Sequence, residues 1–395
     1  MSRLRSASNK LIAMSLFLGV AALGSAWPWS ASKEIKIGFV AQLTGGDSYI
    51  GQAAKLALED RIKELNSRGG LAGRQVQLIT YDSRTQPTEV VAATRRLIEH
   101  DDVVAVIGPE WTAASIPLGP ISEQAKIPVI TTTASNVKVT LNNDNSVKPF
   151  MFRTCFIDPY QGFALADFAY KDLKKRRAAF IYDVGSAYSM GIMQYFEDAF
   201  TKRGGQVVAK EGFQALDTEF RAQLSKVAKT NPDVLVVPVG TYRDIALIAK
   251  QADALGLRFQ YLGVDGWVND ELLTLAGREL EGAYLSSGLS TADPKFKAYN
   301  ENFLKAHNVK ATIFAYYALD AMYMLEYAIT TSVAKVHKVD PVAIKNELEN
   351  MKDVPVFTSN LTIEPKTHNP HNKPIVIMAI RGSKWNISKT YAPAD

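Results

Sequence analysis

The sequence contains one cysteine, Cys155, among its 395 residues, and its five histidines are scattered along the chain. A single thiol cannot form a disulfide within the chain, and it cannot build a tetrahedral sulfur site. The histidines show no spacing that is typical of metal ligands. We therefore expect neither a metal ion nor any other cofactor.

Common catalytic patterns are also missing. No G-x-S-x-G, H-E-x-x-H or G-x-x-x-x-G-K-[ST] pattern occurs in the sequence. The nearest approach, Gly185-Ser186, lacks a glycine two residues after the serine. We expect no catalytic residue. A secreted α/β enzyme stays open as an alternative, although no nucleophile or metal site identifies one.

Long charged or apolar runs are few. The longest run of Lys or Arg is the four residues 174–177, and the formal net charge falls from +5 to about +2 without residues 1–26, which hold three positive charges and no acid. This balance gives no reason to expect nucleic-acid binding. Beyond residue 26, no apolar run approaches the roughly 18 residues of a membrane span.

Residues 1–26 read as a secretory signal peptide. They combine a basic start, an almost wholly apolar stretch from Leu11 to Leu23, and small residues at 24–26. An anchoring N-terminal helix is the alternative, but no polar stripe interrupts the apolar run. Because Cys155 lies far from the cleavage site, we expect a soluble secreted protein that is not a lipoprotein.

Strand-like and helix-like segments alternate through two successive regions of about 100 residues each. In the first region we expect strands at 34–41, 74–82, 103–107 and 128–130, and helices at 52–67, at 87–99 and from an N-cap at Thr112. In the second we expect strands at 178–184, 206–211, 233–239 and 258–264, and helices at 188–203, 218–229 and 242–255. Such alternation predicts an α/β fold with two doubly wound parallel-sheet lobes.

The rhythm changes after residue 281. Helices are expected at 294–307, 312–330 and 341–351, and strands at 359–363 and 373–380. The segment 312–330 is apolar on most of its surface, which predicts a helix buried between layers. We assign 33–155 to lobe 1, with 286–352 returning to it, and 156–285 to lobe 2, with 353–395 returning to it. This division implies a hinge that the chain crosses several times.

Polar residues at the ends of the expected strands form a candidate binding site. Ligands of open α/β sheets bind at the carboxyl ends of the strands. In lobe 1, a helix beginning at Thr112 offers free N–H groups for a carboxylate, and the hydroxyl of Ser135 lies after the next strand. The alternatives are a helix cap for Thr112 and a turn-stabilising hydroxyl for Ser135. The site is expected to bind rather than to react.

Lobe 2 contributes further candidates. Asp265 follows an apolar strand and suits an ammonium group, although a hinge or capping role is the alternative. Tyr188 and Tyr242 begin two expected helices, where they are either ligand contacts or half-exposed aromatics. Asp158 lies where the chain passes between the lobes and either contacts the ligand or caps a helix. Trp111 and Trp267 are expected to form apolar walls, unless they are packing residues.

The chain resembles the leucine/isoleucine/valine-binding proteins, the amino-acid branch of the type I periplasmic solute-binding proteins of ABC importers. The resemblance covers nearly the whole mature chain and lies in IKIGFVAQLTG (35–45), LNSRGGLAGRQVQL (65–78), VVAVIGP (103–109), FRTCFIDPYQG (152–162), NPDVLVVPVG (231–240), YLGVDGW (261–267) and FAYYALDAMYML (314–325). It implies the type I periplasmic binding protein fold, in which two lobes close over a solute.

The resemblance also implies roles for the candidates. Thr112, the backbone of Thr133 and the hydroxyl of Ser135 would bind the carboxylate of the solute, and Asp158 and Asp265 would face its ammonium group. Tyr188 and Tyr242 would close over the solute from lobe 2.

The chain departs from the family pattern at three places. The position of the aromatic expected in the first loop falls near Ile50, with Tyr49 one place early; Ser189 replaces the glycine that is usual after the Tyr188 position; and Glu110-Trp111 is bulkier and more acidic than is common there. These departures leave the identity of the solute open.

The function expected from these residues is binding of a small zwitterion, a branched-chain or related amino acid, in the periplasm. The protein would deliver this solute to ABC permease subunits in the inner membrane, and nucleic acid is not an expected partner. The alternative is a receptor or regulator of the same fold that senses a ligand and acts on a protein partner. A cytoplasmic regulator would lack the signal peptide.

Overall fold

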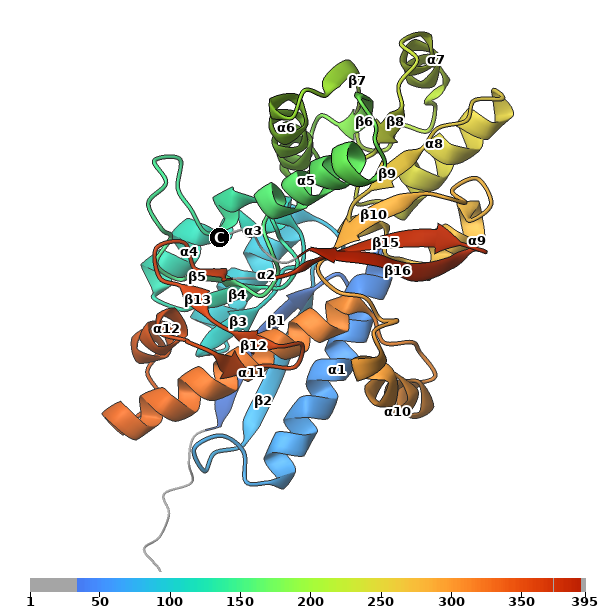
Figure 1. Cartoon of the computed structure of the whole chain (residues 1–395). Helices are drawn as coiled ribbons and strands as arrows, with labels where there is room; N and C mark the ends of the chain where they lie inside the picture. The colour runs from blue at the N-terminus through green and yellow to red at the C-terminus, as the bar shows by residue number, and fades with distance from the viewer. Residues whose placement is uncertain (1–33, 372, 392–395) are drawn as a thin grey trace, which may run out of the picture. The chain divides into compact units, whose positions relative to one another are not determined.

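The computed structural model describes residues 34–371 and 373–391, and the residues from Glu34 onward form one compact unit. The predicted signal peptide lies outside the described residues. Within the described part of the chain, no helix combines the length and apolar character that crossing a bilayer would require. Two large sheets with helices on their faces organise the unit (Figure 1).

The first sheet is wholly parallel, with the strand order β2-β1-β3-β4-β5. Its strands are β1 (Ile35–Ala41), β2 (Val76–Asp82), β3 (Ala105–Ile107), β4 (Val129–Thr131) and β5 (Met151–Arg153). β1 and β3 are almost completely buried, as expected for strands covered on both faces. The predicted parallel sheet is therefore confirmed. β5 was not predicted, because the charged residue Arg153 interrupts its apolar pattern.

Helices cover both faces of this sheet. One face packs against α1 (Ser48–Ser67), α11 (Ile313–Val336) and α12 (Pro341–Glu349), and the other against α2 (Pro87–Glu99), α3 (Thr112–Ser115) and α4 (Leu118–Ala125). The 3-10 turn η1 (Val137–Val139) follows β4. Because both faces are covered, the loops at the strand ends are the part of the sheet left for a ligand.

The structure corrects the prediction of a helix capped by Thr112. Trp111 is the N-cap, with extended backbone angles of −118° and 153°, and Thr112 is already the first helical residue. No side chain caps this helix, which ends after four residues. The Thr112 hydroxyl is consequently not used for capping, and it is buried without a hydrogen-bond partner among the described residues.

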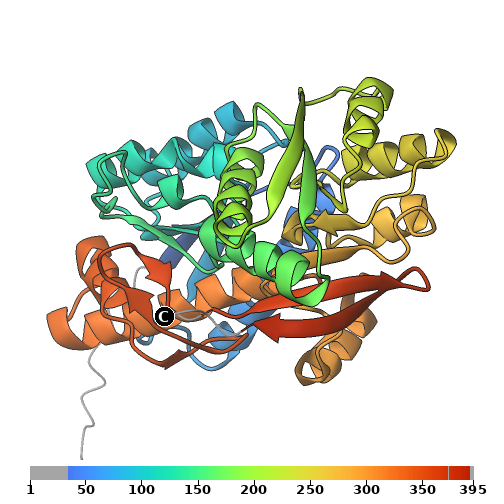
Figure 2. The same ribbon diagram turned by 45° about the horizontal axis from the view of Figure 1, so that its top comes forward.

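The second sheet has the strand order β16-β15-β10-β9-β8-β6-β7. Its strands are β6 (Arg177–Asp183), β7 (Gln206–Phe213), β8 (Val234–Val236), β9 (Tyr261–Gly263), β10 (Tyr284–Ser287), β15 (Ile375–Arg381) and β16 (Lys384–Tyr391). Strands β6 to β10 are parallel, which confirms the predicted second α/β unit. The hairpin β15–β16 adds two antiparallel edge strands, seen in red in Figure 2. β16 is mostly exposed, so it gave no apolar signal in the sequence.

The second sheet also has helices around it, and its core is a large apolar cluster. The helices are α5 (Asp158–Asp167), the π-helical turn η2 (Phe168–Asp172), α6 (Ala187–Lys202), α7 (Arg221–Lys229), α8 (Tyr242–Ala254), η3 (Asp265–Trp267), α9 (Asp270–Ala276), η4 (Pro294–Phe296) and α10 (Lys297–His307). Cys155, the only thiol, is buried in this cluster.

Helix α11 joins the two cores. Its first turns, including Phe314 and Tyr317, belong to the cluster of the second sheet, and its later residues, such as Leu325, belong to that of the first. Figure 1 shows α11 alongside α1. Burial of most of its residues confirms the prediction for 312–330.

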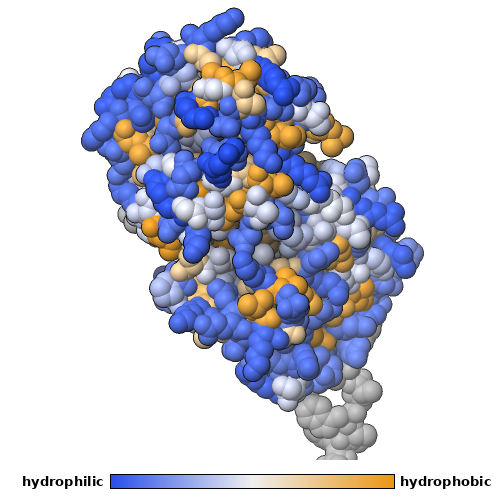
Figure 3. Space-filling view, turned by 90° about the vertical axis from the view of Figure 1, so that its right-hand side faces the viewer, coloured by the Kyte–Doolittle hydropathy of each residue, from blue (hydrophilic) through white to orange (hydrophobic). Residues whose placement is uncertain are grey.

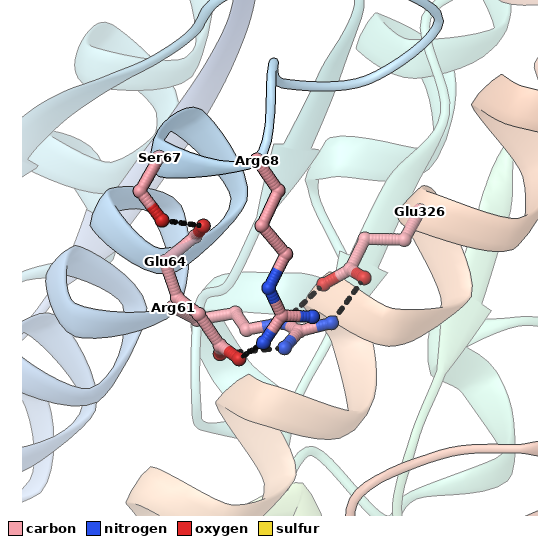
Figure 4. A network of polar contacts seen from close by, with 5 residues as sticks. All are labelled: Arg61, Glu64, Ser67, Arg68 and Glu326. Atoms are coloured by element: carbon pink, nitrogen blue, oxygen red, sulfur yellow. Dashed lines mark hydrogen bonds and ion pairs between the residues drawn. The ribbon is translucent and has the colours of Figure 1, made fainter.

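A polar contact between α1 and α11 holds this long helix in place. Arg61 makes two hydrogen bonds to Glu326, at 2.7 and 2.6 Å, and a third to Glu64 at 2.7 Å, as Figure 4 shows. Arg68 also pairs with Glu64, whose carbonyl accepts from Ser67. A two-pronged arginine–carboxylate pair fixes orientation as well as distance, so α11 is anchored on the first-sheet side.

The lobe boundaries stay a prediction, but parts of both returning segments pack differently from the expectation. Phe296 and Phe303, within 286–352, lie in the second-sheet core, whereas that segment was assigned to lobe 1. The strands β11 (Val354–Pro355), β12 (Asn360–Leu361), β13 (Ile363–Glu364) and β14 (Asn369–Pro370) form two short hairpins. Val354, Leu361 and Ile363 pack into the first-sheet core, whereas 353–395 was assigned to lobe 2. Of the described strands after residue 353, β15 and β16 are the two that join the second sheet.

Most of the surface seen in Figure 3 is hydrophilic, with hydrophobic residues in small groups. Scattered apolar residues of this kind are normal on a soluble domain.

Candidate functional site

A cavity of about 270 Å³ opens where strand ends of both sheets meet. Its walls include the loops after β1, β3 and β4 on one side and those after β6, β8 and β9 on the other. The lining residues are Gln42, Asp47, Tyr49, Ile50, Thr85, Glu110, Trp111, Thr112, Ala113, Thr133, Asp183, Ser186, Tyr188, Ser189, Val239, Gly240, Thr241, Asp265, Gly266 and Phe314. Five predicted site residues are among them: Trp111, Thr112, Thr133, Tyr188 and Asp265.

Thr112 and Thr133 form the hydroxyl-bearing part of the first-sheet wall. The Thr133 hydroxyl donates to the Glu110 carbonyl at 2.6 Å, which ties the loops after β3 and β4 together. The Thr112 hydroxyl has no partner among the described residues. A buried hydroxyl without a partner is costly, so it is suited to an incoming acceptor such as a carboxylate oxygen.

Asp265 and Tyr188 form the opposite wall. The Asp265 Oδ1 accepts from the Tyr188 hydroxyl at 2.5 Å and from the Gln161 amide at 2.9 Å. Burial raises the pKa of Asp265, and the bonds from Tyr188 and Gln161 partly offset this rise. The carboxylate is therefore held in one orientation at the cavity wall, where a positively charged ligand group would stabilise its charged form.

Four predicted site residues lie outside the lining of the cavity. Tyr242 packs edge-on against Tyr49, with ring centroids 5.9 Å apart, so Tyr49 stands at the cavity wall and Tyr242 does not. Trp267 is fully buried and donates its indole N–H to the Val237 carbonyl at 3.0 Å. Both lie in the second-sheet core, which is the packing role left open for Trp267, whereas Tyr242 is buried rather than half-exposed. Ligand contact by either stays an untested prediction.

Ser135 and Asp158 lie together behind the cavity. The Asn136 side chain donates to Asp158 Oδ2 and to the Ala187 carbonyl, both at 2.9 Å, and so bridges the β4 loop and α6. Burial raises the pKa of Asp158 to about 7, although the Ser135 hydroxyl and Arg153 oppose the rise. A ligand role for these two residues also stays untested, and their contacts are those of a connection between the two sheets.

Sequence reasoning missed several polar lining residues. Gln42, Asp183 and Thr85 each lie at the carboxyl end of a strand of the two sheets or shortly after it, so the rule that located Asp265 could have found them. Asp47 begins α1, which starts four residues earlier than predicted. The location of Asp47 at the cavity could be inferred only from the observed start of this helix.

Glu110 is the most unusual lining residue. It is 3% exposed, and burial raises its pKa to about 8 against the partial opposition of the backbone N–H groups of Glu110 and Gln42. Neither carboxyl oxygen has a well-formed hydrogen bond to a described residue. The burial of Glu110 thus favours a neutral carboxyl group here.

This burial predicts a pH-dependent loss of stability. The folded protein keeps the Glu110 proton up to about pH 8, whereas a carboxyl at its ordinary pKa of 4.5 releases it. The folded state therefore binds more protons between these pH values, and the free energy of unfolding falls as pH rises through that window. Glu110→Gln should remove this contribution and be more stable than the wild type at pH 9, by on the order of a few kcal/mol.

Urea unfolding of both proteins at pH 5 and pH 9 measures this effect. Because the other buried carboxyls are common to both, their difference isolates Glu110. Glu123→Gln, a change at an exposed residue of α4, is the matched control and should follow the wild type. A constant difference between Glu110→Gln and the wild type at the two pH values would contradict the prediction.

The arrangement as a whole suits binding. Hydroxyl groups lie on one wall, a fixed carboxylate lies on the other, and aromatic residues Tyr49 and Phe314, 5.8 Å apart, close one side. A zwitterion presents the matching charges. The Ser186 hydroxyl accepts from the Ser189 N–H at 3.2 Å as the cap of α6, which gives it a structural task.

Known proteins show the same architecture. A family model described as periplasmic binding protein matches residues 34–384. Leu/Ile/Val-binding protein homolog 3 of Brucella melitensis is 26% identical over 334 residues, covering 84% of this chain and 88% of that protein. A leucine-, isoleucine-, valine-, threonine- and alanine-binding protein of Pseudomonas aeruginosa is 27% identical over 354 residues. The match covers 89% of this chain and 91% of that protein.

Solved structures agree with these relatives. The leucine-binding protein LivK of Thermotoga maritima superposes with a TM-score of 0.81 at 29% identity, covering 91% of this chain and 99% of that one. LivJ of Streptococcus pneumoniae, solved with isoleucine, superposes with a TM-score of 0.82 at 26% identity. The superposition covers 91% of this chain and 100% of that one. The chain therefore belongs to the periplasmic binding protein family, in the type I branch that includes the Leu/Ile/Val-binding proteins.

Proposed function

We propose that this protein is the solute-binding component of an ABC importer, and that it binds an amino acid in the cavity between its two sheets. Its relatives are amino-acid-binding proteins by name, and the family consists of solute-binding proteins rather than enzymes. The observation that carries the proposal is that Thr112 and Asp265, from different sheets, line one cavity. A solute with a carboxylate and an ammonium group can reach both.

Binding would work by closure. The solute's carboxylate meets the first-sheet wall at Thr112 and the Thr133 backbone, and its ammonium group then meets Asp265 from the second. Hydrogen bonds to charged groups contribute roughly 1.5–3 kcal/mol each, so two of them present only in the closed state make that state dominant. The closed protein would dock on permease subunits in the inner membrane from the periplasm and would not transform its solute.

Thermal unfolding in the presence of candidate solutes tests this function. The protein without residues 1–26 is screened against amino acids and against small carboxylates that lack an amino group. A solute at 100 times its Kd stabilises the folded state by about 2.7 kcal/mol, which raises the melting temperature measurably. Stabilisation by amino acids is the expected result. If only the carboxylates without an amino group stabilise the protein, the ammonium role of Asp265 is wrong.

A further inference from the structure

Glu110 has the features of a group that lacks its partner. It follows β3, lines the cavity and is 3% exposed, and its two carboxyl oxygens have no well-formed hydrogen bond within the described residues. Burying a carboxyl group in this way is costly unless something compensates for it. Since the residue faces the cavity, a bound solute can supply the compensation.

Gln42 provides a second acceptor beside it. Phe39 of β1 pairs with Ile107 of β3, and Gln42 and Glu110 each lie three residues beyond these partners. Both residues line the cavity, and the Gln42 Oε1, like the two Glu110 carboxyl oxygens, is buried without a hydrogen-bond partner among the described residues. Two neighbouring strand ends thus bring three buried side-chain oxygen atoms, one on Gln42 and two on Glu110, to one stretch of wall.

The rest of the lining adds negative charge. Asp47, Asp183 and Asp265 also line the cavity, and no Lys, Arg or His is among its described lining residues. Arg243 lies near Asp47 and lowers its pKa against the effect of burial, but Arg243 is outside the lining. An apolar side chain on the solute would leave Glu110 unpaired, whereas a cationic donor would pair with it.

We propose that the solute carries, besides its amino-acid head group, a positively charged hydrogen-bond donor at the end of its side chain, and that Glu110 and Gln42 hold this donor. The inference rests on the proposed amino-acid-binding function and names the class of solute. The two ends of the solute are bound by residues that follow strands of different sheets. Asp265 meets the α-ammonium group from the second sheet, and Glu110 meets the side-chain cation from the first. Lysine, ornithine and arginine are members of this class.

Burial of the Glu110 carboxyl is therefore unfavourable by itself, and it serves binding when a cation pairs with the carboxyl group. Its pKa of about 8 keeps the carboxyl mostly neutral near pH 7, and a cation in contact would favour the charged form. The acidic residue at position 110, which departs from the family pattern, is explained in this way as a determinant of solute specificity.

Calorimetric titration with lysine and norleucine tests the proposal, because norleucine has the same carbon chain without the terminal amine. The wild type should bind lysine at least about 10-fold more tightly than norleucine, as expected for one buried charge pair. Glu110→Gln should weaken lysine binding by about 10-fold or more and leave norleucine binding within about 3-fold. Gln42→Leu should reduce the preference for lysine in the same direction, and Glu123→Gln should leave both affinities unchanged.

The possible outcomes separate this inference from the proposed function. If neutral aliphatic amino acids bind as tightly as lysine, arginine and ornithine or more tightly, the function survives and the inference is overturned. Equal affinities for glutamine and lysine would also overturn it, because charge would then not be recognised. An unchanged lysine-to-norleucine ratio in Glu110→Gln removes Glu110 from the role. If no amino acid of any kind binds, the proposed function itself fails.

Discussion

Replacing Asp265 by asparagine is expected to weaken amino-acid binding by about 30-fold or more, equivalent to about 2 kcal/mol. The carboxylate is 6% exposed and is fixed by Tyr188 and Gln161, so in the complex it would form a desolvated pair with the ammonium group. Asparagine keeps the shape of the side chain and removes the charge. Calorimetric titration with the best amino acid from the thermal screen measures the loss.

Folding and binding can be separated in this experiment. Since burial raises the pKa of Asp265, the neutral asparagine should fold with at least wild-type stability. Asp270→Asn is the matched control, because Asp270 lies five residues later and forms an exposed pair with Lys310 at 2.6 Å. It should bind like the wild type. Unchanged affinity in Asp265→Asn would rule out the ammonium role.

Replacing Asp320 by alanine is expected to lower the free energy of unfolding by about 3–5 kcal/mol. This residue of α11 is fully buried and pairs with Lys373 at 3.2 Å, just before β15. It also accepts from the Thr358 N–H at 2.8 Å and from its hydroxyl at 2.6 Å. The alanine variant would leave a buried ammonium without its counter-charge. Urea unfolding measures the change.

Two comparisons make this stability prediction specific. The pair between Lys55 and Glu59 is similar in length, at 2.8 Å, but both side chains are exposed, so Glu59→Ala should cost no more than about 1 kcal/mol. The double variant Asp320→Leu with Lys373→Met should recover part of the loss, because it removes both charges together. A loss below about 1 kcal/mol in Asp320→Ala would show that Lys373 does not depend on this partner.

Much of the fold was predictable because its signals are local. The parallel strands are short apolar runs, and α2 begins and ends where Pro87 and Glu99 predict. Longer-range elements were missed for physical reasons. β5 ends in the charged residue Arg153, which interrupts its apolar pattern, and β16 is an exposed edge strand that exists because it pairs with β15. Pairing of that kind depends on the partner strand rather than on a local apolar pattern.

The site residues also divide into those that the sequence could predict and those that it could not. The rule that ligands bind at strand ends placed Thr112 and Asp265 on one cavity, since parallel strands carry their carboxyl ends to the same edge, and the family resemblance added Thr133. It could not separate residues at the cavity wall from residues one layer behind it. Tyr242 and Trp267 also follow strands, yet they turn into the second-sheet core. A side chain's direction depends on neighbours that are distant in the sequence.

By itself, the sequence determined the two α/β units, the family and the binding edge, because periodicity and strand-end position are properties of neighbouring residues. Only the tertiary structure decided that the hairpins at 354–370 pack on the first sheet and that Gln42 and Glu110 lie side by side on one wall. The physical reason is that burial and partnering of a side chain are set by contacts across the fold, which no local pattern contains.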